Sequence, residues 1–198
     1  MLDLTIAGFP FAFWIGIVKK ARNRRLYREF HFNKWHTFPV NHRLYALKIM
    51  RHLNRHVTDS DVVVEIGCGL AEILAGIRKG LKKGYDIEPN VIRAAKLMHR
   101  NRADISLEVG SFEQVRSDAS ISFLITVNFI HEISPYALRN MYANIFDKLR
   151  VKTLIAEEVQ GQDYKYHHNI SELIPAYFKL EQTIKITDSR RVLVYRHD

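Results

Sequence analysis

The sequence predicts an α/β fold in which helices cover both faces of a mostly parallel sheet. Val62–Ile66 is a short β-branched run without a polar face, which is typical of a strand buried on both sides. Beyond Thr58, apolar runs alternate with helical patterns, which indicates parallel strands joined by right-handed crossovers. Polar and apolar residues alternate in Lys179–Thr187 and in Arg191–Arg196, so we expect the chain to close with a hairpin.

The other elements follow in order between these landmarks. Further strands are expected in a short run ending at Asp86, in Ile105–Val109, in Ile121–Val127 and in Thr153–Ala156. Helices are expected over Glu72–Leu81, from near Pro89, from Ser134 to about Leu149, and around Asn169–Ala176. The 198 residues suffice for one sizeable core, and the average composition, 47% hydrophobic and 26% charged, disfavours disordered or fibrous classes.

We interpret residues 1–56 as an N-terminal extension and residues 57–198 as the main domain. Leucines and one methionine recur at three-residue spacing from Leu44 to Leu53, which predicts an amphipathic helix that buries Leu44, Leu47, Met50 and Leu53. Before it, the aromatic stretch Phe30–Val40 contains Pro39 and predicts an ordered loop.

Charge is concentrated in the extension. Residues 1–56 carry 11 Lys/Arg and two acidic residues, whereas residues 57–198 carry 19 of each sign, so the extension accounts for the net charge of +9. We therefore expect an anionic partner there, and phosphate backbones, anionic lipid head groups and phosphorylated small molecules all fit.

The first residues form the apolar run Leu4–Val18, followed at once by basic residues. A spanning helix needs about 20 apolar residues, and this shorter run contains Pro10 and two glycines, so we expect none. A secretory signal would carry its positive charge before the run. Two interpretations stay open. The segment packs on the core or on another chain, such as a second copy in a homodimer, or it anchors on an anionic membrane surface through Phe9, Phe11, Phe13 and Trp14.

A glycine turn follows the first strand of the main domain. Gly67 and Gly69 lack Cβ atoms, so a ligand can approach the backbone between strand and helix. Asp86 ends the next strand, 21 residues after Glu65, the spacing at which an acidic side chain meets ribose hydroxyls in nucleotide-binding βαβ units. The pair predicts a nucleotide-type cofactor. Cys68, the single cysteine, can form no internal disulfide, which favours a cytoplasmic location, peripheral on the inner membrane face if the apolar run is an anchor.

Three segments, Glu65–Gly69, Gly84–Pro89 and Asn128–Glu132, resemble the class I S-adenosylmethionine-dependent methyltransferases. The resemblance covers about residues 57–198 and includes the closing hairpin, which distinguishes this family from ordinary dinucleotide-binding folds. It implies a Rossmann-like seven-stranded sheet of order 3-2-1-4-5-7-6 with an antiparallel last strand. It also implies S-adenosylmethionine as the cofactor and S-adenosylhomocysteine as its product.

The resemblance assigns roles to individual residues. The glycines would line the methionine part of the cofactor while Glu65 fixes the loop, Asp86 would bind the ribose hydroxyls, and Ile87 would pack on the adenine. Ser111 stands where the family often has an acid for the adenine amino group. The implied cofactor-binding residues are Glu65, Gly67, Cys68, Gly69, Asp86, Ile87, Ser111, Phe112 and Asn128.

An NAD-binding domain is the rival interpretation of the same loop. Glu72 stands where the GxGxxG pattern has its third glycine, and a dehydrogenase would need further chain for a substrate domain. A nucleophilic role for Cys68 is also disfavoured, because cysteine is common at this position in the family that the loop resembles.

Methyl transfer is an in-line displacement in which the protein mainly positions the reactants and supplies a base when the acceptor is a hydroxyl. The expected catalytic residues lie at the carboxyl edge of the sheet and are His131, Glu132, Glu157 and Glu158; His36, His167 and His168 are further candidates for the base. Structural roles remain open for all of them. No metal is expected, because Asn128, Glu157 and Glu158 imitate the ligands of metal-dependent members only loosely.

The acceptor is indicated by the extension. Phe32–His36 and Arg43–Tyr45 are similar to a segment of methyltransferases from bacterial surface-polysaccharide gene clusters. Aromatic faces stack on sugar rings and arginines suit a diphosphate, so the expected acceptor-binding residues are Trp35, His36, Arg43 and Tyr45. A packing role for Trp35 and His36 is equally open.

The expected function is O-methylation of a small or lipid-linked anionic acceptor such as a sugar, with the extension covering the cleft. An RNA methyltransferase is the alternative and is less favoured, because Phe129 and Ile130 follow Asn128 where an amino-methylating enzyme would carry an Asn-Pro-Pro-Tyr-like motif. A non-catalytic, cofactor-binding subunit that docks another chain through its apolar N-terminus is the third candidate.

Overall fold

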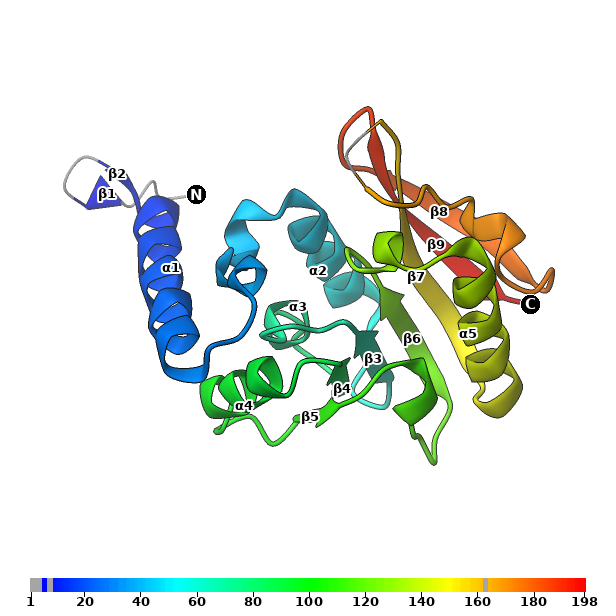
Figure 1. The fold of residues 1–198 in the computed structure, drawn as a ribbon, viewed down its shortest axis with the longest axis horizontal. Coiled ribbons are helices and arrows are strands. Elements are labelled where there is room, and N and C mark those ends of the chain that lie inside the picture. The colour runs from blue at the N-terminus through cyan, green and yellow to red at the C-terminus, as the bar shows by residue number, and fades with distance from the viewer. Residues whose placement is uncertain (1–4, 7–8, 162–163) are drawn as a thin grey trace.

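The fold is built on one seven-stranded sheet (Figure 1). The computed structural model describes residues 5–6, 9–161 and 164–198, and before Gly16 it describes the backbone only. The strand order is β5-β4-β3-β6-β7-β9-β8. The strands are β3 (Val62–Ile66), β4 (Leu81–Asp86), β5 (Ile105–Val109), β6 (Ile121–Thr126), β7 (Val151–Val159), β8 (Phe178–Lys185) and β9 (Arg190–His197). β9 is antiparallel to both neighbours and the other adjacent pairs are parallel, which confirms the predicted topology.

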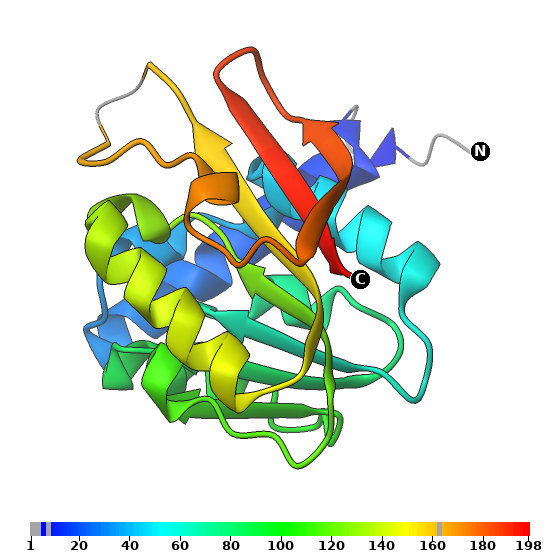
Figure 2. The same ribbon diagram turned by 90° about the vertical axis from the view of Figure 1, so that its right-hand side faces the viewer.

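Helices cover both faces of this sheet, as predicted. α2 (Leu44–His56), α3 (Glu72–Ala75) and α4 (Pro89–Met98) lie on one face, and α5 (Pro135–Lys148) lies on the other (Figures 1 and 2). Successive strand residues point to opposite faces. Val63 accordingly packs with the α2–α4 side, whereas Val62 and Val64 pack with the α5 side. Both faces of β3 are therefore buried, which explains its uninterrupted apolar sequence.

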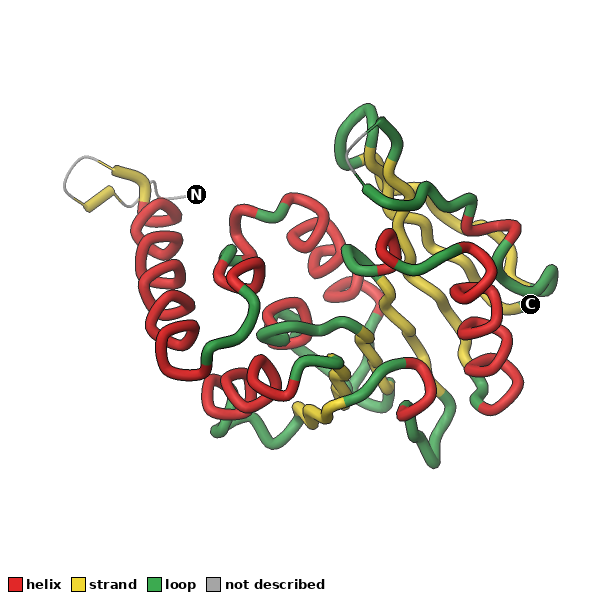
Figure 3. The backbone as a smooth tube through the Cα atoms, viewed as in Figure 1, coloured by secondary structure: helices red, strands yellow, loops and turns green. Residues whose placement is uncertain are grey.

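The N-terminal extension is largely helical. The short strands β1 (Thr5–Ile6) and β2 (Phe9–Pro10) pair ahead of the long helix α1 (Phe11–Phe30). The predicted ordered loop contains two 3-10 helices, η1 (Lys34–Thr37) and η2 (Val40–His42), which Figure 3 shows between α1 and α2. Gly16 of α1 lies so close to Asn41 that a Cβ there would be 2.7 Å from its Nδ2 atom. The extension therefore folds back along its own first helix.

The predicted buried face of α2 is confirmed at Leu53, which is buried, and in part at Met50, which packs against the core. It was wrong at Leu44 and Leu47, which are 48% and 37% exposed, whereas Tyr45 and Ile49 are buried together with Leu53. The three buried residues follow a four-residue spacing, which keeps them on the same side of a helix. Both stripes of this helix are apolar, so composition alone did not distinguish them.

Two predicted helices are much shorter in the structure. The helix expected over Glu72–Leu81 ends at Ala75, and Gly76 is its C-cap residue. Met50 packs against Gly76 so closely that a Cβ there would lie 2.0 Å from its sulfur. The chain then turns at Gly80, with φ +76°, into β4. The helix expected around Asn169–Ala176 is a single 3-10 turn, η5 (Ile170–Glu172). Pro175 disfavours helical geometry in the residue before it.

No helix in the described part of the chain is long and apolar enough to cross a membrane. The proposed membrane contact through Phe9, Phe11, Phe13 and Trp14 concerns side chains that lie outside the described residues.

Candidate functional site

The loop between β3 and α3 requires glycine at two positions. Gly67 and Gly69 have φ values of +69° and +54°, in the left-handed region that other residues rarely adopt. A Cβ on Gly67 would lie 2.4 Å from the ring of Phe129. A Cβ on Gly69 would lie 2.7 Å from Nδ1 of His36. The loop is thus a bare backbone surface that is contacted by two aromatic rings.

Asp86 ties this loop to the end of β4. Its Oδ2 accepts a hydrogen bond from the Gly69 N–H at 2.8 Å, and its Oδ1 accepts one from the Glu88 N–H at 3.0 Å. Each carboxylate oxygen can accept a further hydrogen bond. The sequence spacing between Glu65 and Asp86 therefore brings together the two predicted parts of one cradle, a glycine turn and a strand-end acid.

The other residues assigned to the cofactor follow the neighbouring strands at the same edge of the sheet. Ile87, next to Asp86, has a side chain that is 76% exposed. Ser111 opens the 3-10 helix η3 (Phe112–Gln114) after β5, and Phe112 is buried with its ring edge-on to Tyr142. Asn128 follows β6 in an exposed turn with φ +70°. Ile87 and Asn128 are accessible, whereas Phe112 is part of the core.

Glu65 is a buried carboxyl directly beneath the loop. Burial raises its pKa to about 8, the nearby Arg43 charge opposes this rise, and Asp86 adds to it. Within the described residues, its Oε2 atom has no hydrogen-bond partner. A carboxyl oxygen that can form a further hydrogen bond thus lies under the glycine turn.

Cys68 lies within the turn, and its surroundings disfavour the thiolate form. Burial, together with the nearby Glu65 and Asp86, raises the pKa of its thiol well above the ordinary value. The thiolate that nucleophilic or redox chemistry needs is therefore absent at neutral pH.

The N-terminal extension is fastened to the first residue of α3. The Glu72 carboxylate, whose side chain is 4% exposed, accepts hydrogen bonds from Arg22 at 2.8 Å and from Arg43 at 2.6 Å. It also accepts the backbone N–H of Val40 at 3.1 Å. One buried acid thus holds three separate parts of the extension.

A second fastening lies beside Asp86. The Glu88 carboxylate accepts the backbone N–H of Asn33 at 2.7 Å, and its other oxygen lies 3.4 Å from Nε2 of His36. The same imidazole contacts Gly69. The extension therefore lies directly on the glycine loop, while Trp35, the preceding residue, is 68% exposed.

The carboxyl ends of β6 and β7 carry a buried ionic network. Arg190 donates from Nε and Nη2 to Oε2 of Glu157, at 2.9 and 2.7 Å. The other carboxylate oxygen accepts the backbone N–H of Asn128, and it lies 3.3 Å from Nε2 of His131. Glu157 is fully buried and His131 is 1% exposed. Two predicted catalytic residues thus form one pair that is enclosed by protein.

The remaining catalytic candidates differ in their surroundings. Glu158 points to the opposite face, where it pairs with Arg191 at 2.5 Å and accepts the Ile170 N–H at 2.9 Å. Glu132, in the 3-10 helix η4 (Ile130–Glu132), is exposed. The opposite orientation of the two adjacent glutamates follows from the alternation along a strand.

The predicted acceptor-binding residues separate into two groups. Arg43 is engaged by Glu72, and Tyr45 is 4% exposed with the Arg190 guanidinium 4.0 Å above its ring centre. Tyr45 therefore presents no open surface, and Arg43 keeps 27% of its side chain exposed. His36 faces the glycine loop, and Trp35 is largely exposed.

Sequence reasoning missed Glu72, Glu88, Phe129 and Arg190. Glu72 was read only as a departure from a glycine pattern, although it is the main attachment point of the extension. Arg190 lies 33 residues beyond Glu157, and no local pattern connects them. The contact of Phe129 with Gly67 depends on how two loops fold together, which no spacing reveals.

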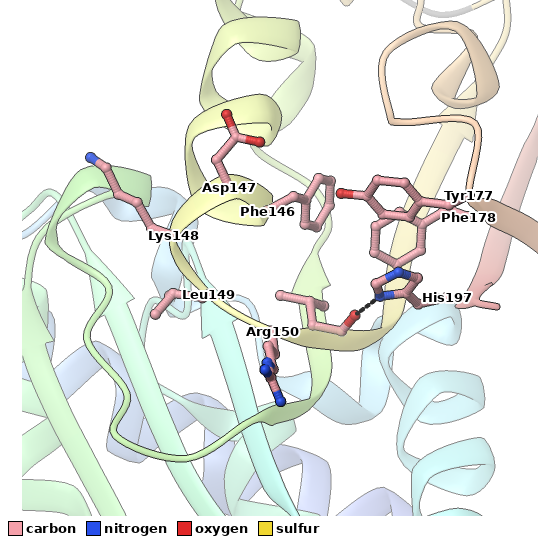
Figure 4. Close-up of a pocket in the computed structure, with 9 residues that line it drawn as sticks. Phe146, Asp147, Lys148, Leu149, Arg150, Tyr177, Phe178 and His197 are labelled. Carbon is pink, nitrogen blue, oxygen red and sulfur yellow. Dashed lines mark hydrogen bonds between the residues drawn. The ribbon is translucent and has the colours of Figure 1, made fainter.

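A small cavity at the other edge of the sheet is unrelated to this site. It measures about 250 Å³ and lies where α5 ends and β7 begins (Figure 4). The rings of Tyr177 and His197 lie there with their centroids 4.4 Å apart and tilted by 31°, and Nδ1 of His197 lies 3.3 Å from the carbonyl oxygen of Val151. Among the described residues, no group of three or more His, Cys, Asp or Glu side chains is arranged to hold a metal ion.

Comparison with known proteins supports the fold strongly. No protein-family model matches the sequence, and no curated protein matches it. The N-methyltransferase NodS from Bradyrhizobium japonicum WM9, in complex with S-adenosyl-L-homocysteine, is similar with a TM-score of 0.70 at 12% identity, over 89% of this chain and 98% of that one. Magnesium protoporphyrin IX methyltransferase (ChlM) from Synechocystis PCC 6803, with bound SAM, gives 0.67 at 12% identity, over 98% and 100%. The chain therefore has the fold of the S-adenosylmethionine-dependent methyltransferases.

Proposed function

We propose that this chain is an S-adenosylmethionine-dependent methyltransferase. The observation that carries the proposal is the cradle in which the Gly69 N–H donates to Asp86 at 2.8 Å, between the first two strands of a methyltransferase-type sheet. In open α/β sheets, ligands bind outside the carboxyl ends of the strands. NodS and ChlM were crystallised with SAH and SAM, respectively.

The residues present fit this cofactor. Gly67 and Gly69 have the left-handed backbone of a tight turn between strand and helix, and the Asp86 oxygens retain acceptor capacity for ribose hydroxyls. The unpartnered Oε2 of Glu65 fits a cationic amino group such as that of the methionine part. When bound, S-adenosylmethionine supplies an electrophilic methyl group on a sulfonium centre.

For a hydroxyl acceptor, we assign the role of general base to His36. The imidazole is accessible, with 24% of its side chain exposed, and Glu88 lies 3.4 Å from its Nε2 atom. A carboxylate beside Nε2 favours a hydrogen on that nitrogen, and this tautomer leaves Nδ1, on the side of the ring that faces Gly69, as a proton acceptor. A base oriented by a carboxylate is the arrangement that proton abstraction requires.

His131 and Glu157 have a positioning role in this proposal. Because Glu157 accepts the Asn128 N–H and is neutralised by Arg190, it fixes the turn after β6 that faces the cradle. Glu158 fastens the chain at Ile170 by accepting its backbone N–H.

The acceptor class follows from the extension, which lies on the glycine loop and carries the excess positive charge. We propose O-methylation of a small or lipid-linked anionic acceptor such as a sugar. An acceptor of this kind would be attracted by charge before it reaches the cofactor.

The proposal is tested by calorimetric titration of the purified chain with S-adenosylhomocysteine and, separately, with NAD. We expect micromolar binding of S-adenosylhomocysteine and none of NAD. Methyl transfer is then measured from labelled S-adenosylmethionine to pooled sugar phosphates, lipid-linked sugars and RNA. Binding of NAD alone would overturn the proposal, and transfer to RNA alone would overturn the acceptor class. Cofactor binding without transfer to any pool would indicate a non-catalytic subunit.

A further inference from the structure

The extension contains a basic groove that the cofactor site does not use. This groove measures about 750 Å³ and lies between α1 and the 33–42 segment. Its wall on α1 carries Lys20, Arg24 and Arg28, and its opposite wall carries Lys34, Trp35 and Phe38. The volume is in the range typical of small-molecule sites, about 300 to 1,000 Å³.

The cations of the groove are concentrated and unneutralised. Lys20, Arg24 and Arg28 are spaced four residues apart, so they share one face of α1, where like charges repel. Within the described residues, none of these three or Lys34 has an acidic partner, whereas Arg22 on the same helix pairs with buried Glu72. The helix therefore neutralises its charge on the side that packs on the protein and leaves it uncompensated in the groove.

Exposed aromatic rings stand beside these charges. Trp35 is 68% exposed and Phe38 is 56% exposed. Large aromatic side chains with this much accessible surface are characteristic of ligand-contact sites, because burial of their faces is strongly favourable. Rings next to arginines suit a ligand that combines a phosphate group with a sugar or another ring.

The groove adjoins the cofactor cradle through η1. Trp35 lies on the groove side of this turn, and the next residue, His36, contacts Gly69 on the other side. A ligand held in the groove is thus separated from the glycine loop by a single 3-10 turn.

From this arrangement we infer that the groove binds the phosphate or diphosphate group of the acceptor, with its attached ring on Trp35. The inference rests on the proposed function, since it assigns the groove to the acceptor of the same reaction. A diphosphate carries several negative charges, which match four cations better than a single carboxylate does. The phosphate could belong to a soluble sugar nucleotide or to a lipid head group, and these two sources share the same chemistry.

The test measures binding of inorganic pyrophosphate and uridine diphosphate to the full chain by calorimetry. The variant Arg24→Ala/Arg28→Ala is compared with the control Arg25→Ala/Arg51→Ala, which removes two exposed arginines outside the groove. We expect the groove variant to weaken both ligands by about tenfold or more, because charged hydrogen bonds are lost. The control variant should bind both ligands like the native chain.

A second variant tests the aromatic part. In the native chain, uridine diphosphate should bind more tightly than pyrophosphate, and Trp35→Ala should remove that difference while it leaves pyrophosphate binding unchanged. Equal binding of both ligands by the native chain would overturn the assignment of the ring to Trp35.

Vesicles of phosphatidylcholine mixed with phosphatidylglycerol distinguish the sources. Vesicle binding that is lost in the groove variant but not in the control identifies a lipid phosphate, and binding of the soluble ligands alone identifies a soluble acceptor. If the groove variant and the control behave alike toward every probe, the inference is overturned. S-adenosylhomocysteine is titrated into the same variants, so a chain that binds it but no phosphate refutes the groove alone, whereas the reverse refutes the proposed function.

Discussion

Two buried carboxyls lie in the two halves of the sheet, and the protein treats them in opposite ways. Glu65, in β3, has no ion-pair partner within the described residues, and burial raises its pKa to about 8. Glu157, in β7, is more deeply buried, yet Arg190 neutralises it and its two oxygens accept four hydrogen bonds. Glu65 therefore keeps an oxygen without a partner, whereas both oxygens of Glu157 have partners within the protein.

The contrast between Glu65 and Glu157 shows how residues that can bind a ligand differ from residues that stabilise the fold. Both acids belong to strands of the same sheet, and sequence position alone assigned a role in the site to each. A group that lacks a partner in the protein is available to a ligand, whereas a group whose hydrogen bonds are satisfied internally stabilises the fold. We therefore expect mutations in the two halves to affect different measurements.

The largest effect is expected at Glu157. Glu157→Ala leaves Arg190, with only 16% of its side chain exposed, without its partner and should lower the free energy of unfolding by about 3 to 5 kcal/mol. Urea denaturation measures this loss. Glu158→Ala is the matched control, because Arg191 is 51% exposed and can return to water, so its loss should be smaller. If Glu157→Ala instead left the stability unchanged but abolished methyl transfer, Glu157 would act directly in the reaction rather than in support of the fold.

Glu65 should produce a pH dependence of stability. Its pKa in the folded chain, about 8, lies above the ordinary value of 4.5, so the folded state holds the proton more tightly. Its contribution is full below pH 4.5 and is lost as the pH rises through 8, with a maximum slope of about 1.4 kcal/mol per pH unit. Glu65→Gln should remove this slope in urea denaturations at pH 5 to 9. A native chain that is equally stable across this range would contradict the assignment.

Asp86→Ala tests the cradle directly. The variant loses the acceptor of the Gly69 and Glu88 amides and the group assigned to the ribose, so its affinity for S-adenosylhomocysteine should fall about a hundredfold, or about 2.7 kcal/mol. Calorimetry measures the change, and Asp118→Ala, which removes an exposed acid outside the cradle, is the control. If both variants bind S-adenosylhomocysteine like the native chain, Asp86 has no part in cofactor binding.

The smallest effect is expected from Gly69→Ala. A Cβ at φ +54° costs about 1 to 2 kcal/mol and in addition meets His36. Gly161→Ala, at φ +65° with nothing within 4 Å, isolates the backbone cost. The loss of unfolding free energy for Gly69→Ala should exceed that for Gly161→Ala, and the excess measures the contact with His36. This excess should disappear when Gly69→Ala is introduced into the His36→Ala variant and compared with that variant.

The type and position of the strands were predictable because local patterns report burial, whereas the strand order was implied by the family resemblance. Apolar runs such as Ile121–Val127, and the cap at Ser134 before Pro135, specify element type without knowledge of the partners. The length of α3 was missed, although Gly76, the residue that caps it, is a common helix-ending residue.

The candidate site was predictable only in part. Gly67, Gly69 and Asp86 follow from spacing, because backbone conformation and strand ends are local properties. The partners that exclude Tyr45 from an open surface, or that bury Glu157, come from distant parts of the chain. The type of a side chain shows what it can bind, but its partners in the fold determine whether it is free to bind a ligand. Glu157 is not free, because Arg190 already pairs with it.

In the turn η1, Trp35 lines the basic groove and the next residue, His36, packs on the glycine loop. If both sites bind their proposed ligands, an occupant of one site that displaces this turn also alters the other site. Such linkage is reciprocal, so the factor by which the first ligand changes the affinity for the second equals the factor in the opposite direction. We therefore expect this one 3-10 turn to couple cofactor binding and acceptor binding.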